Sequence, residues 1–336
     1  FADYKSSNPA LHATASAPAP PELESPAAPS TGNGRTEAPT APAPAAPGTA
    51  AARPAASSRP AGEAGQVPDN AQPIRGVAAT IAANMTRSLT VPTATSFRNV
   101  PAKLLEVNRK VINGYRQRAG LGKVSFTHLI GYAVVRAIAD AVPVMKNTYT
   151  EGPDGKPLLV KHDTVNLGLA VDVEKADGSR TLVVPVIREA DRLDFAGFLG
   201  AYEELIRKVR ANKLTPDDFQ GANVTLTNPG TIGTVQSVPR LMPGQGVIVG
   251  VGAIDYPAEF EGADRANLSS LGVSKVVTIT STYDHRIIQG AESGLFLKRV
   301  HELLVGVDFS LYQASFKQWF GAELAPPAAG FPVEFK

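Results

Sequence analysis

One of the five histidines in this chain stands where a side chain could take part in chemistry. His285 lies in YDHRIIQGAESG (283–294), after a run of β-branched residues and before a predicted helix, with Asp284 and Arg286 on either side. A junction of this kind often exposes a side chain at the edge of a sheet. A neutral imidazole there could act as a general acid or base near neutral pH. The alternative is a structural histidine that caps or pairs within the loop, and the local sequence leaves both open.

The other four histidines have simpler interpretations. His12 lies in a Pro/Ala-rich segment, and His128 lies in a helical pattern that is apolar almost all round, which favours a core role. His162 stands between two charged residues and is expected to be solvated. His301 lies in the last turns of a predicted helix, where the helix dipole stabilises a cation.

Several classes of function are disfavoured by what the sequence lacks. With no cysteine, this chain has no thiol catalysis, disulfide or thiolate ligand, and no HExxH motif or histidine pair predicts a metal site. GQGVIVGVG (244–252) lacks the spacing of a dinucleotide-binding loop, and neither a P-loop nor a G-x-S-x-G motif is present. A net charge of +2 without a basic block argues against nucleic-acid binding. Without a membrane-spanning run or a signal-peptide pattern, a cytoplasmic protein with no membrane contact is expected.

The composition divides the chain into three regions. Residues 1–72 are predicted to be a disordered linker, because residues 1–70 hold 13 prolines and 20 alanines and can bury little apolar surface. A disordered tail without a tethering role is the alternative. Residues 73–306 have a globular pattern. Residues 307–336 are predicted to be a C-terminal tail or the start of a connection to a further domain.

The globular region mixes helical and strand periodicity. Helices are predicted over 100–120, 125–142, 194–212 and 291–306, and strands over 165–173, 180–187, 223–228, 246–254 and 274–283. The first helix is expected to bury a stripe of Leu104, Val107, Val111 and Tyr115, and Asp194 is the predicted N-cap of the third. This order predicts an α/β or α+β domain around one mixed sheet with a large antiparallel share.

Three stretches carry a resemblance to a known family. STYDHRIIQGAESGLFLKRVHELL (281–304) resembles the D-H-R-x-x-x-G signature of the dihydrolipoamide acyltransferases (E2) of 2-oxo acid dehydrogenase complexes. VTLTNPGTIGTVQSVPRLMPGQGVIVGVGAI (224–254) resembles their T/S-N-x-G signature, and IRGVAATIAANMTRSLTVPTATSFRNV (74–100) looks like their opening helix and strand. The resemblance covers 74–306. It is strongest to an actinobacterial branch in which a succinyltransferase domain is fused to a 2-oxoglutarate decarboxylase.

The resemblance implies a fold and a reaction. The fold would be the chloramphenicol-acetyltransferase-like one, in a trimer with active sites at the subunit interfaces. The reaction would transfer an acyl group, here a succinyl group, between dihydrolipoamide and coenzyme A, as the E2 step of 2-oxoglutarate dehydrogenase. His285 matches the family's general base. Thr227, by itself an ordinary strand threonine, matches the hydroxyl that donates to the oxyanion, and the neighbouring chain would supply it.

One candidate site residue departs from the family pattern. Gln289 stands four residues after His285, where the family has Asp or Asn that helps to fix the active-site loop. Glutamine keeps an amide but loses the charge, so a salt bridge from this position is lost. The base and the oxyanion donor are unaffected.

The resemblance also implies partners outside the chain. No lipoyl domain or peripheral-subunit-binding domain is recognisable in it, so the lipoyl group would come from a lipoyl-domain-bearing protein. Thiamine diphosphate and Mg²⁺ would belong only to a fused or separate decarboxylase (E1) outside these residues. Two alternatives remain: a non-catalytic trimeric scaffold for such a complex, and a small-molecule acetyltransferase of the same fold.

Overall fold

The computed structural model describes residues 70–174, 178 and 180–307. The chain divides into two compact units, Phe1–Ala71 and Gln72–Lys336, and nearly all described residues belong to the second. Almost all of the predicted linker and of the predicted C-terminal tail therefore lies outside the described residues.

A seven-stranded mixed sheet forms the centre of the second unit. Its order is β1-β9-β8-β7-β4-β5, and β6 also pairs with β4. The strands are β1 (Thr93–Pro101), β4 (Leu167–Glu174), β5 (Arg180–Val183), β6 (Val186–Ile187), β7 (Val224–Thr227), β8 (Val247–Asp255) and β9 (Val276–Asp284). The β4–β7 and β7–β8 pairs are parallel, and the remaining pairs are antiparallel. The predicted mixed sheet is confirmed.

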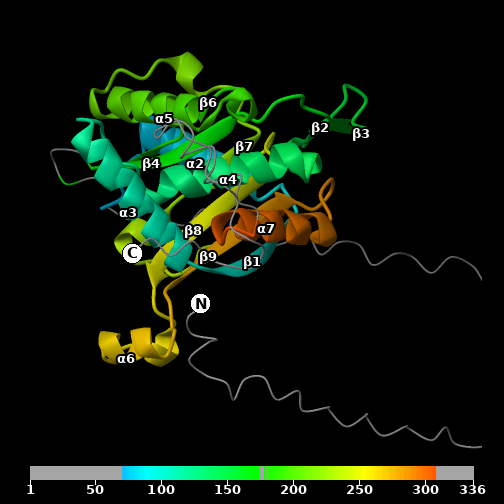
Figure 1. Cartoon of the computed structure of the whole chain (residues 1–336). Helices are drawn as coiled ribbons and strands as arrows, with labels where there is room; N and C mark the ends of the chain where they lie inside the picture. Colours follow the sequence, from blue (N-terminus) through cyan, green and yellow to red (C-terminus); the bar gives the residue numbers. More distant parts are fainter. Residues whose placement is uncertain (1–69, 175–177, 179, 308–336) are drawn as a thin grey trace, which may run out of the picture. The chain divides into compact units, whose positions relative to one another are not determined.

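Most of the helices lie against this sheet (Figure 1). They are α2 (Val77–Ser88), α3 (Lys103–Arg118), α4 (Phe126–Asp140), α5 (Phe195–Arg210), the short α6 (Arg265–Ser270) and α7 (Gly290–Leu304). In Figure 1, α4 and α7 run side by side across one face of the sheet, and α7 packs on β1 and β9. Asp194 accepts the Gly197 N–H and caps α5, as predicted.

The main core lies between the sheet and these helices. Alternate residues of β8, namely Val247, Val249 and Val251, face it, because successive strand side chains point to opposite faces. Ile248 faces the other way and packs with Val91 and Leu241 in a second, smaller cluster. The segment between β7 and β8 therefore covers the opposite face of β8.

The first helix after β1 buries a different stripe from the predicted one. In α3, the buried residues are Leu105, Asn108, Ile112 and Arg116, one position after each predicted residue. The four predicted residues are only partly buried, and three of them, Leu104, Val111 and Tyr115, pack against the edge of the core. A pattern of apolar residues misses this face, because two of its four buried residues are polar. Arg116 donates to the Gly122 carbonyl, and the Asn108 amide is buried without a hydrogen-bond partner.

Two further elements were not predicted from the sequence. A β-hairpin of β2 (Thr148–Glu151) and β3 (Pro157–Val160) forms its own two-stranded sheet. The excursion between β8 and β9 carries α6 and extends away from the sheet in Figure 1. Both elements are short and lack a long periodic pattern, which is why periodicity did not reveal them.

Candidate active site

The turn after β9 holds His285 in a defined position. The His285 N–H donates to the Pro92 carbonyl just before β1, at 2.9 Å. The Asp284 carbonyl accepts the N–H groups of Ile287 and Ile288, at 3.2 and 3.0 Å, which closes a tight turn around the histidine. His285 itself is exposed, whereas Ile288 is fully buried in the core. A buried anchor therefore supports an accessible imidazole.

One hydrogen bond sets the tautomer of this imidazole. The Nδ1 atom of His285 lies 3.1 Å from the Ile288 carbonyl oxygen. A carbonyl oxygen can only accept, so Nδ1 carries the hydrogen and, in the neutral ring, Nε2 carries the free lone pair. The ring also lies edge-on to Tyr283, with centroids 5.4 Å apart. These contacts direct Nε2 away from the turn as a proton acceptor.

Asp284 and Arg286 stabilise the turn. Asp284 is buried, and its carboxylate accepts the Arg286 Nε and Nη2 hydrogens at 2.9 and 2.6 Å, as well as the Arg286 backbone N–H at 3.1 Å. The hydrogen bonds to Asp284 raise the pKa of Arg286 above its usual range. A buried carboxylate needs this partner, because an unpaired charge there would be costly. The pair fixes the backbone on both sides of His285.

Thr227 ends β7 between two parallel neighbours. It pairs with Ala170 of β4 and Gly250 of β8, is partly buried, and lines a cavity of about 370 Å³. Directly after it, the Asn228 amide donates to the Thr127 hydroxyl of α4 at 2.6 Å. This bond fixes the end of β7 against α4, next to the cavity that Thr227 lines.

Glycine is required where the loop after β7 crosses β8. A Cβ on Gly230 would lie 2.2 Å from the Gly252 carbonyl carbon, and a Cβ on Gly252 would lie 1.8 Å from the Val235 carbonyl oxygen. Both distances are far below van der Waals contact, so no side chain fits at either position. Gly252, the last glycine of GQGVIVGVG, thus admits the crossing backbone.

Within one chain, Thr227 and His285 lie at different ends of the sheet. Thr227 is level with Gly250, and Gly250 is level with Thr280 of β9. Asp284 lies four residues further along β9, roughly 13 Å at 3.3 Å per residue, and β7 is two strands from β9, roughly another 10 Å. One chain therefore does not bring the two side chains together.

Gln289 forms the N-cap of α7. Its backbone N–H donates to the Glu292 carboxylate at 2.6 Å, and its side chain is exposed. Among the described residues, no hydrogen bond connects the Gln289 side chain with His285. The residue thus begins the helix that follows the turn, and its direct role in chemistry stays a prediction.

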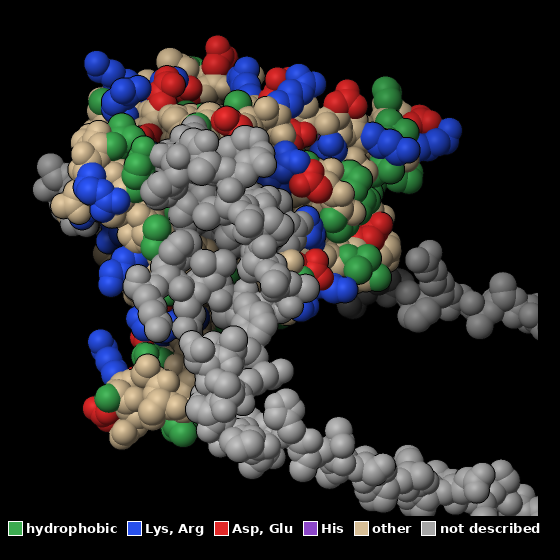
Figure 2. Space-filling view, viewed as in Figure 1, with side chains coloured by type: hydrophobic (Ala, Val, Ile, Leu, Met, Phe, Trp, Pro, Cys, Tyr) green, Lys and Arg blue, Asp and Glu red, His purple; other side chains and the backbone are tan. Residues whose placement is uncertain are grey.

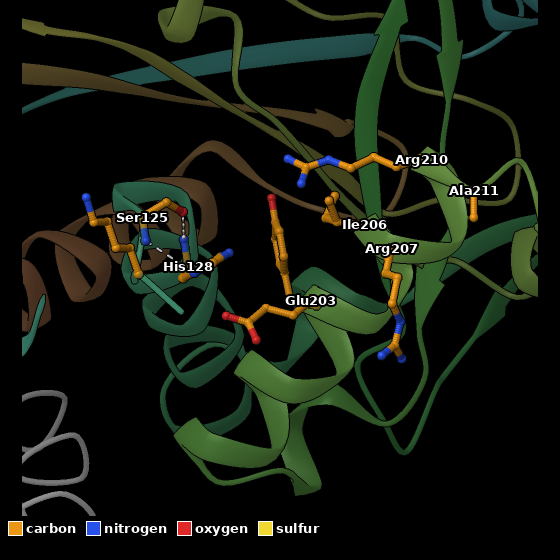
Figure 3. Close-up of a pocket in the computed structure, with 9 residues that line it drawn as sticks. Ser125, His128, Glu203, Ile206, Arg207, Arg210 and Ala211 are labelled. Atoms are coloured by element: carbon orange, nitrogen blue, oxygen red, sulfur yellow. Dashed lines mark hydrogen bonds between the residues drawn. The ribbon is translucent and has the colours of Figure 1, made fainter. Parts of the chain in front are cut away.

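A basic cavity that the sequence did not predict adjoins the Thr227 cavity. It measures about 780 Å³ and lies between the start of α4 and the C-terminal half of α5, lined by Lys123, Ser125, His128, Tyr202, Glu203, Ile206, Arg207, Arg210 and Ala211. In Figure 3, Ser125 and His128 face Glu203 and Ile206 of α5 across the cavity. Tyr202 and Ile206 line both cavities. The sequence signal that could have indicated this cavity is the spacing of Arg207 and Arg210, which lie three residues apart on one face of a helix.

His128 is buried at the wall of this cavity. Its Nδ1 accepts the Ser125 N–H and its own N–H donates to the Ser125 hydroxyl, both at 3.2 Å, and its ring contacts Tyr202 with centroids 4.3 Å apart. Burial, with a smaller contribution from Arg116, lowers the pKa of His128 to about 4. The predicted core role is correct for the ring edge that carries Nδ1. This edge is buried and accepts the Ser125 N–H in the capping box that begins α4.

Two other histidines differ from the expectations. His162 Nε2 lies 2.9 Å from the Thr148 hydroxyl, and partial burial lowers its pKa, so it is not simply solvated. Burial also lowers the pKa of His301, which therefore favours its neutral form over the cation expected at a helix end. In both cases tertiary contacts outweigh the local sequence.

Within the described ranges, no group of three or more His, Asp or Glu side chains is arranged to hold a metal ion. A search of the same residues for a helix long and apolar enough to cross a bilayer finds none.

Comparisons with known proteins identify the family of this chain. Residues 66–311 match the family model of the 2-oxoacid dehydrogenase acyltransferase catalytic domain. The chain is 55% identical over 251 residues to a multifunctional 2-oxoglutarate metabolism enzyme of Mycobacterium sp. (strain JLS), and 52% identical over 250 residues to its counterpart from Mycolicibacterium vanbaalenii. The matches cover 75% and 74% of this chain but only 20% of each relative, so the chain spans about a fifth of their length.

Solved acyltransferase structures share the fold. A probable dihydrolipoamide acetyltransferase from Listeria monocytogenes superposes with a TM-score of 0.59 at 26% identity, over 70% of this chain and 94% of the other. The dihydrolipoamide acetyltransferase of Azotobacter vinelandii gives 0.58 at 26% identity, over 70% and 91%. The latter was the subject of crystallographic and enzymatic investigations on the role of one serine, one histidine and one asparagine in its catalytic mechanism. With a matched family model over most of its length, the chain belongs to the 2-oxoacid dehydrogenase acyltransferases and carries their catalytic domain.

Proposed function

We propose that this chain transfers a succinyl group between dihydrolipoamide, carried by a partner lipoyl domain, and coenzyme A. The observation that carries the proposal is the His285 imidazole, exposed and held with Nδ1 on the Ile288 carbonyl. In the neutral ring, this arrangement leaves the lone pair of Nε2 free to accept a proton from a thiol. A scaffold has no need of a base with a fixed direction.

The proposed reaction needs one proton acceptor and one oxyanion donor. Nε2 of His285 takes the proton from the coenzyme A thiol as the sulfur attacks the thioester carbonyl of succinyl-dihydrolipoamide. A tetrahedral oxyanion forms, and its collapse breaks the bond to the dihydrolipoamide sulfur. That sulfur leaves as a thiolate and receives the same proton from Nε2. A general base of this kind contributes about 10² to 10⁴ in rate.

Thr227 of a neighbouring chain is the proposed oxyanion donor. The two residues lie at different ends of the sheet in one chain, so a complete site needs a second copy. A cyclic trimer with one site at each interface satisfies this requirement, because every copy then supplies His285 to one site and Thr227 to the next. Gln289 would act only as the cap of α7. The Azotobacter enzyme has its asparagine four positions after its histidine, the same spacing.

The two adjoining cavities fit an elongated, phosphorylated thiol such as coenzyme A. Lys123, Arg207 and Arg210 line the basic cavity, and Glu203 is the carboxylate among its lining residues. Positive charge in a concave site attracts and holds phosphate groups. Since Tyr202 and Ile206 line both cavities, a thiol arm bound from the basic cavity would extend toward Thr227.

The choice of acyl group and partners follows from the relatives. Those matched are named for 2-oxoglutarate metabolism, which supports a succinyl group. We place the lipoyl group on another domain or protein, and thiamine diphosphate with Mg²⁺ on a decarboxylase outside this chain. Residues 73–306 form the proposed catalytic domain, residues 1–72 a linker and residues 307–336 a tail or connection, in a cytoplasmic complex.

An acyl-transfer assay tests the proposal. The purified chain receives coenzyme A and succinyl-dihydrolipoamide, and thioester formation is compared with that of His285→Ala and Thr227→Val. We expect the first variant to lose about 10² to 10⁴ in rate and the second about 10² to 10³. Thr227→Ser keeps a hydroxyl and serves as the matched control.

Two outcomes would contradict the proposal. Equal rates in the parent and both deficient variants would leave only the scaffold role. Full activity from a protein that light scattering shows to be a monomer under assay conditions would exclude a site shared between chains.

A further inference from the structure

A side chain from the β2–β3 hairpin reaches the turn that holds His285. The guanidinium carbon of Arg286 lies 3.5 Å from the centroid of the Tyr149 ring, within the range of a close cation–π contact. Tyr149 belongs to β2, outside the main sheet, and is partly buried. The contact therefore connects a separate element to the catalytic turn.

The position of Tyr149 is fixed by its own surroundings. The segment that leads into β2 packs against Gly246, where a Cβ would lie 2.2 Å from the Asn147 carbonyl oxygen. The Gly246 carbonyl in turn accepts the Asp284 N–H at 3.0 Å. Farther out, Thr148 contacts His162 at 2.9 Å. The base of the hairpin is thus attached to the same backbone that begins the turn.

Arg286 is held from two directions. Its Nε and Nη2 hydrogens point to the Asp284 carboxylate, and the Tyr149 ring covers the face of the guanidinium. A planar guanidinium binds a carboxylate well only when it lies in the right plane, and stacking on an aromatic face selects that plane. Without the ring, Arg286 could rotate toward solvent, since its side chain is already 27% exposed.

A change in how Arg286 is held affects His285 through the backbone of the turn. Asp284 binds the Arg286 N–H with its carboxylate and the Ile287 and Ile288 N–H groups with its carbonyl. These bonds close the turn that brings the Ile288 carbonyl to Nδ1 of His285. A looser Arg286 would therefore loosen the bond that sets the tautomer.

We propose that Tyr149 is a positioning residue for His285, which holds Arg286 against Asp284 so that the imidazole keeps Nδ1 on the Ile288 carbonyl and Nε2 toward the substrate. This inference rests on the proposed function, but the tautomer of His285 can be measured without turnover. The hairpin thus supports the base from outside the main sheet.

Three variants separate this role from simple support of the hairpin. Tyr149→Leu removes the aromatic face, Tyr149→Phe keeps it and removes only the hydroxyl contact with Glu151, and Leu158→Ala is the control. Leu158 pairs with Thr150 rather than with Tyr149 and is 48% exposed, so it perturbs the hairpin on the face away from Tyr149. Apolar side chains are visible at the surface over this hairpin in Figure 2.

The expected result is a loss in kcat with little change in KM. For Tyr149→Leu, we expect kcat for succinyl transfer to fall about tenfold while KM for coenzyme A stays within about twofold, because the base is displaced but the binding cavities are not. Tyr149→Phe and Leu158→Ala should keep the parental kcat. Histidine-selective ¹⁵N NMR should show His285 protonated at Nδ1 in the parent, Tyr149→Phe and Leu158→Ala, and partly at Nε2 in Tyr149→Leu.

Other results would overturn the inference. An unchanged kcat and tautomer in Tyr149→Leu, or the same loss in Leu158→Ala, would leave Tyr149 as a structural residue only. If the parent transfers no succinyl group, the proposed function fails, and the His285 tautomer alone decides whether Tyr149 positions the ring.

Discussion

At the scale of the residue, the environment of each histidine decides its chemistry more than its neighbours in sequence do. His285 and His128 both have an assigned Nδ1 atom, but with opposite roles. Nδ1 of His285 donates to the Ile288 carbonyl, whereas Nδ1 of His128 accepts the Ser125 N–H. His285 therefore offers a lone pair at Nε2, and His128 offers a hydrogen there. Only the exposed ring of His285 is suited to act as a base.

The lowered pKa of His128 predicts a loss of stability in mild acid. The unfolded chain binds a proton near pH 6.5, whereas the folded chain does so only near pH 4. The free energy of unfolding is therefore unaffected by His128 above pH 6.5 and falls as the pH drops from 6.5 toward 4, by at most about 3 kcal/mol. His128→Gln, which can still accept the Ser125 N–H, should remove this part of the pH dependence.

Urea unfolding at about pH 7.5 and about pH 5 measures the effect. The parent should lose more stability between the two conditions than His128→Gln. An equal loss in both proteins would show that His128 is already protonated in the folded state at the lower pH.

At the scale of the element, close packing of backbone on β8 positions the end of β7. The loop after Thr227 crosses Gly252 without room for a Cβ. Gly252→Ala should push this loop outward, displace Thr227 from its cavity, and lower the free energy of unfolding by about 1 to 3 kcal/mol. Urea unfolding and the acyl-transfer rate check the two effects.

Gly200→Ala is the matched control for this substitution. Gly200 is exposed in α5 and has no atom within 4 Å of a built Cβ, so alanine should stabilise the helix by up to about 1 kcal/mol. A Gly252→Ala protein as stable and active as Gly200→Ala would contradict the described crossing.

The C-terminal half of α5 supplies the charge of the basic cavity. Replacing Arg207 and Arg210 together by alanine should raise KM for coenzyme A about tenfold and leave kcat within about twofold, because phosphate binding weakens and the base is untouched. Steady-state kinetics with varied coenzyme A measures both constants.

The control is a second double variant, Arg192→Ala with Arg265→Ala, which removes the same two charges from exposed sites outside this cavity. If both double variants raise KM equally, the effect is one of net charge and the cavity does not bind the phosphates.

At the scale of the whole molecule, the proposed site is divided between copies. His285→Ala and Thr227→Val are each expected to be nearly inactive, but chains of the two kinds unfolded and refolded together should regain activity. In a random equal mixture of cyclic trimers, about one quarter of the interfaces combine an intact histidine with an intact threonine. The mixture should therefore show about a quarter of the parental rate. A mixture as inactive as its components would place both residues of each site in one chain.

Much of this molecule follows from its sequence, and the exceptions have physical causes. Strong periodicity located α4, α5, α7 and the central strands, and the signature around His285 predicted the exposed histidine after β9 that is proposed as the base. The buried stripe of α3 was wrong by one position, because Asn108 and Arg116 are buried polar residues that an apolar pattern omits. The basic cavity and the Tyr149–Arg286 contact join segments far apart in sequence, and no local pattern encodes such contacts.

The anchoring of the imidazole at Nδ1 has a consequence for the direction of flux. In the proposed reaction, that edge of the ring stays bound to the Ile288 carbonyl. The proton taken from one sulfur and the proton given to the other therefore both pass through Nε2, and the ring ends each turnover as it began. No exchange with bulk water is needed between turnovers. The sulfur of dihydrolipoamide and the sulfur of coenzyme A would therefore meet the same base, and the transfer can run in either direction. The ratios of acylated to free dihydrolipoamide and of acylated to free coenzyme A then set the direction of net transfer.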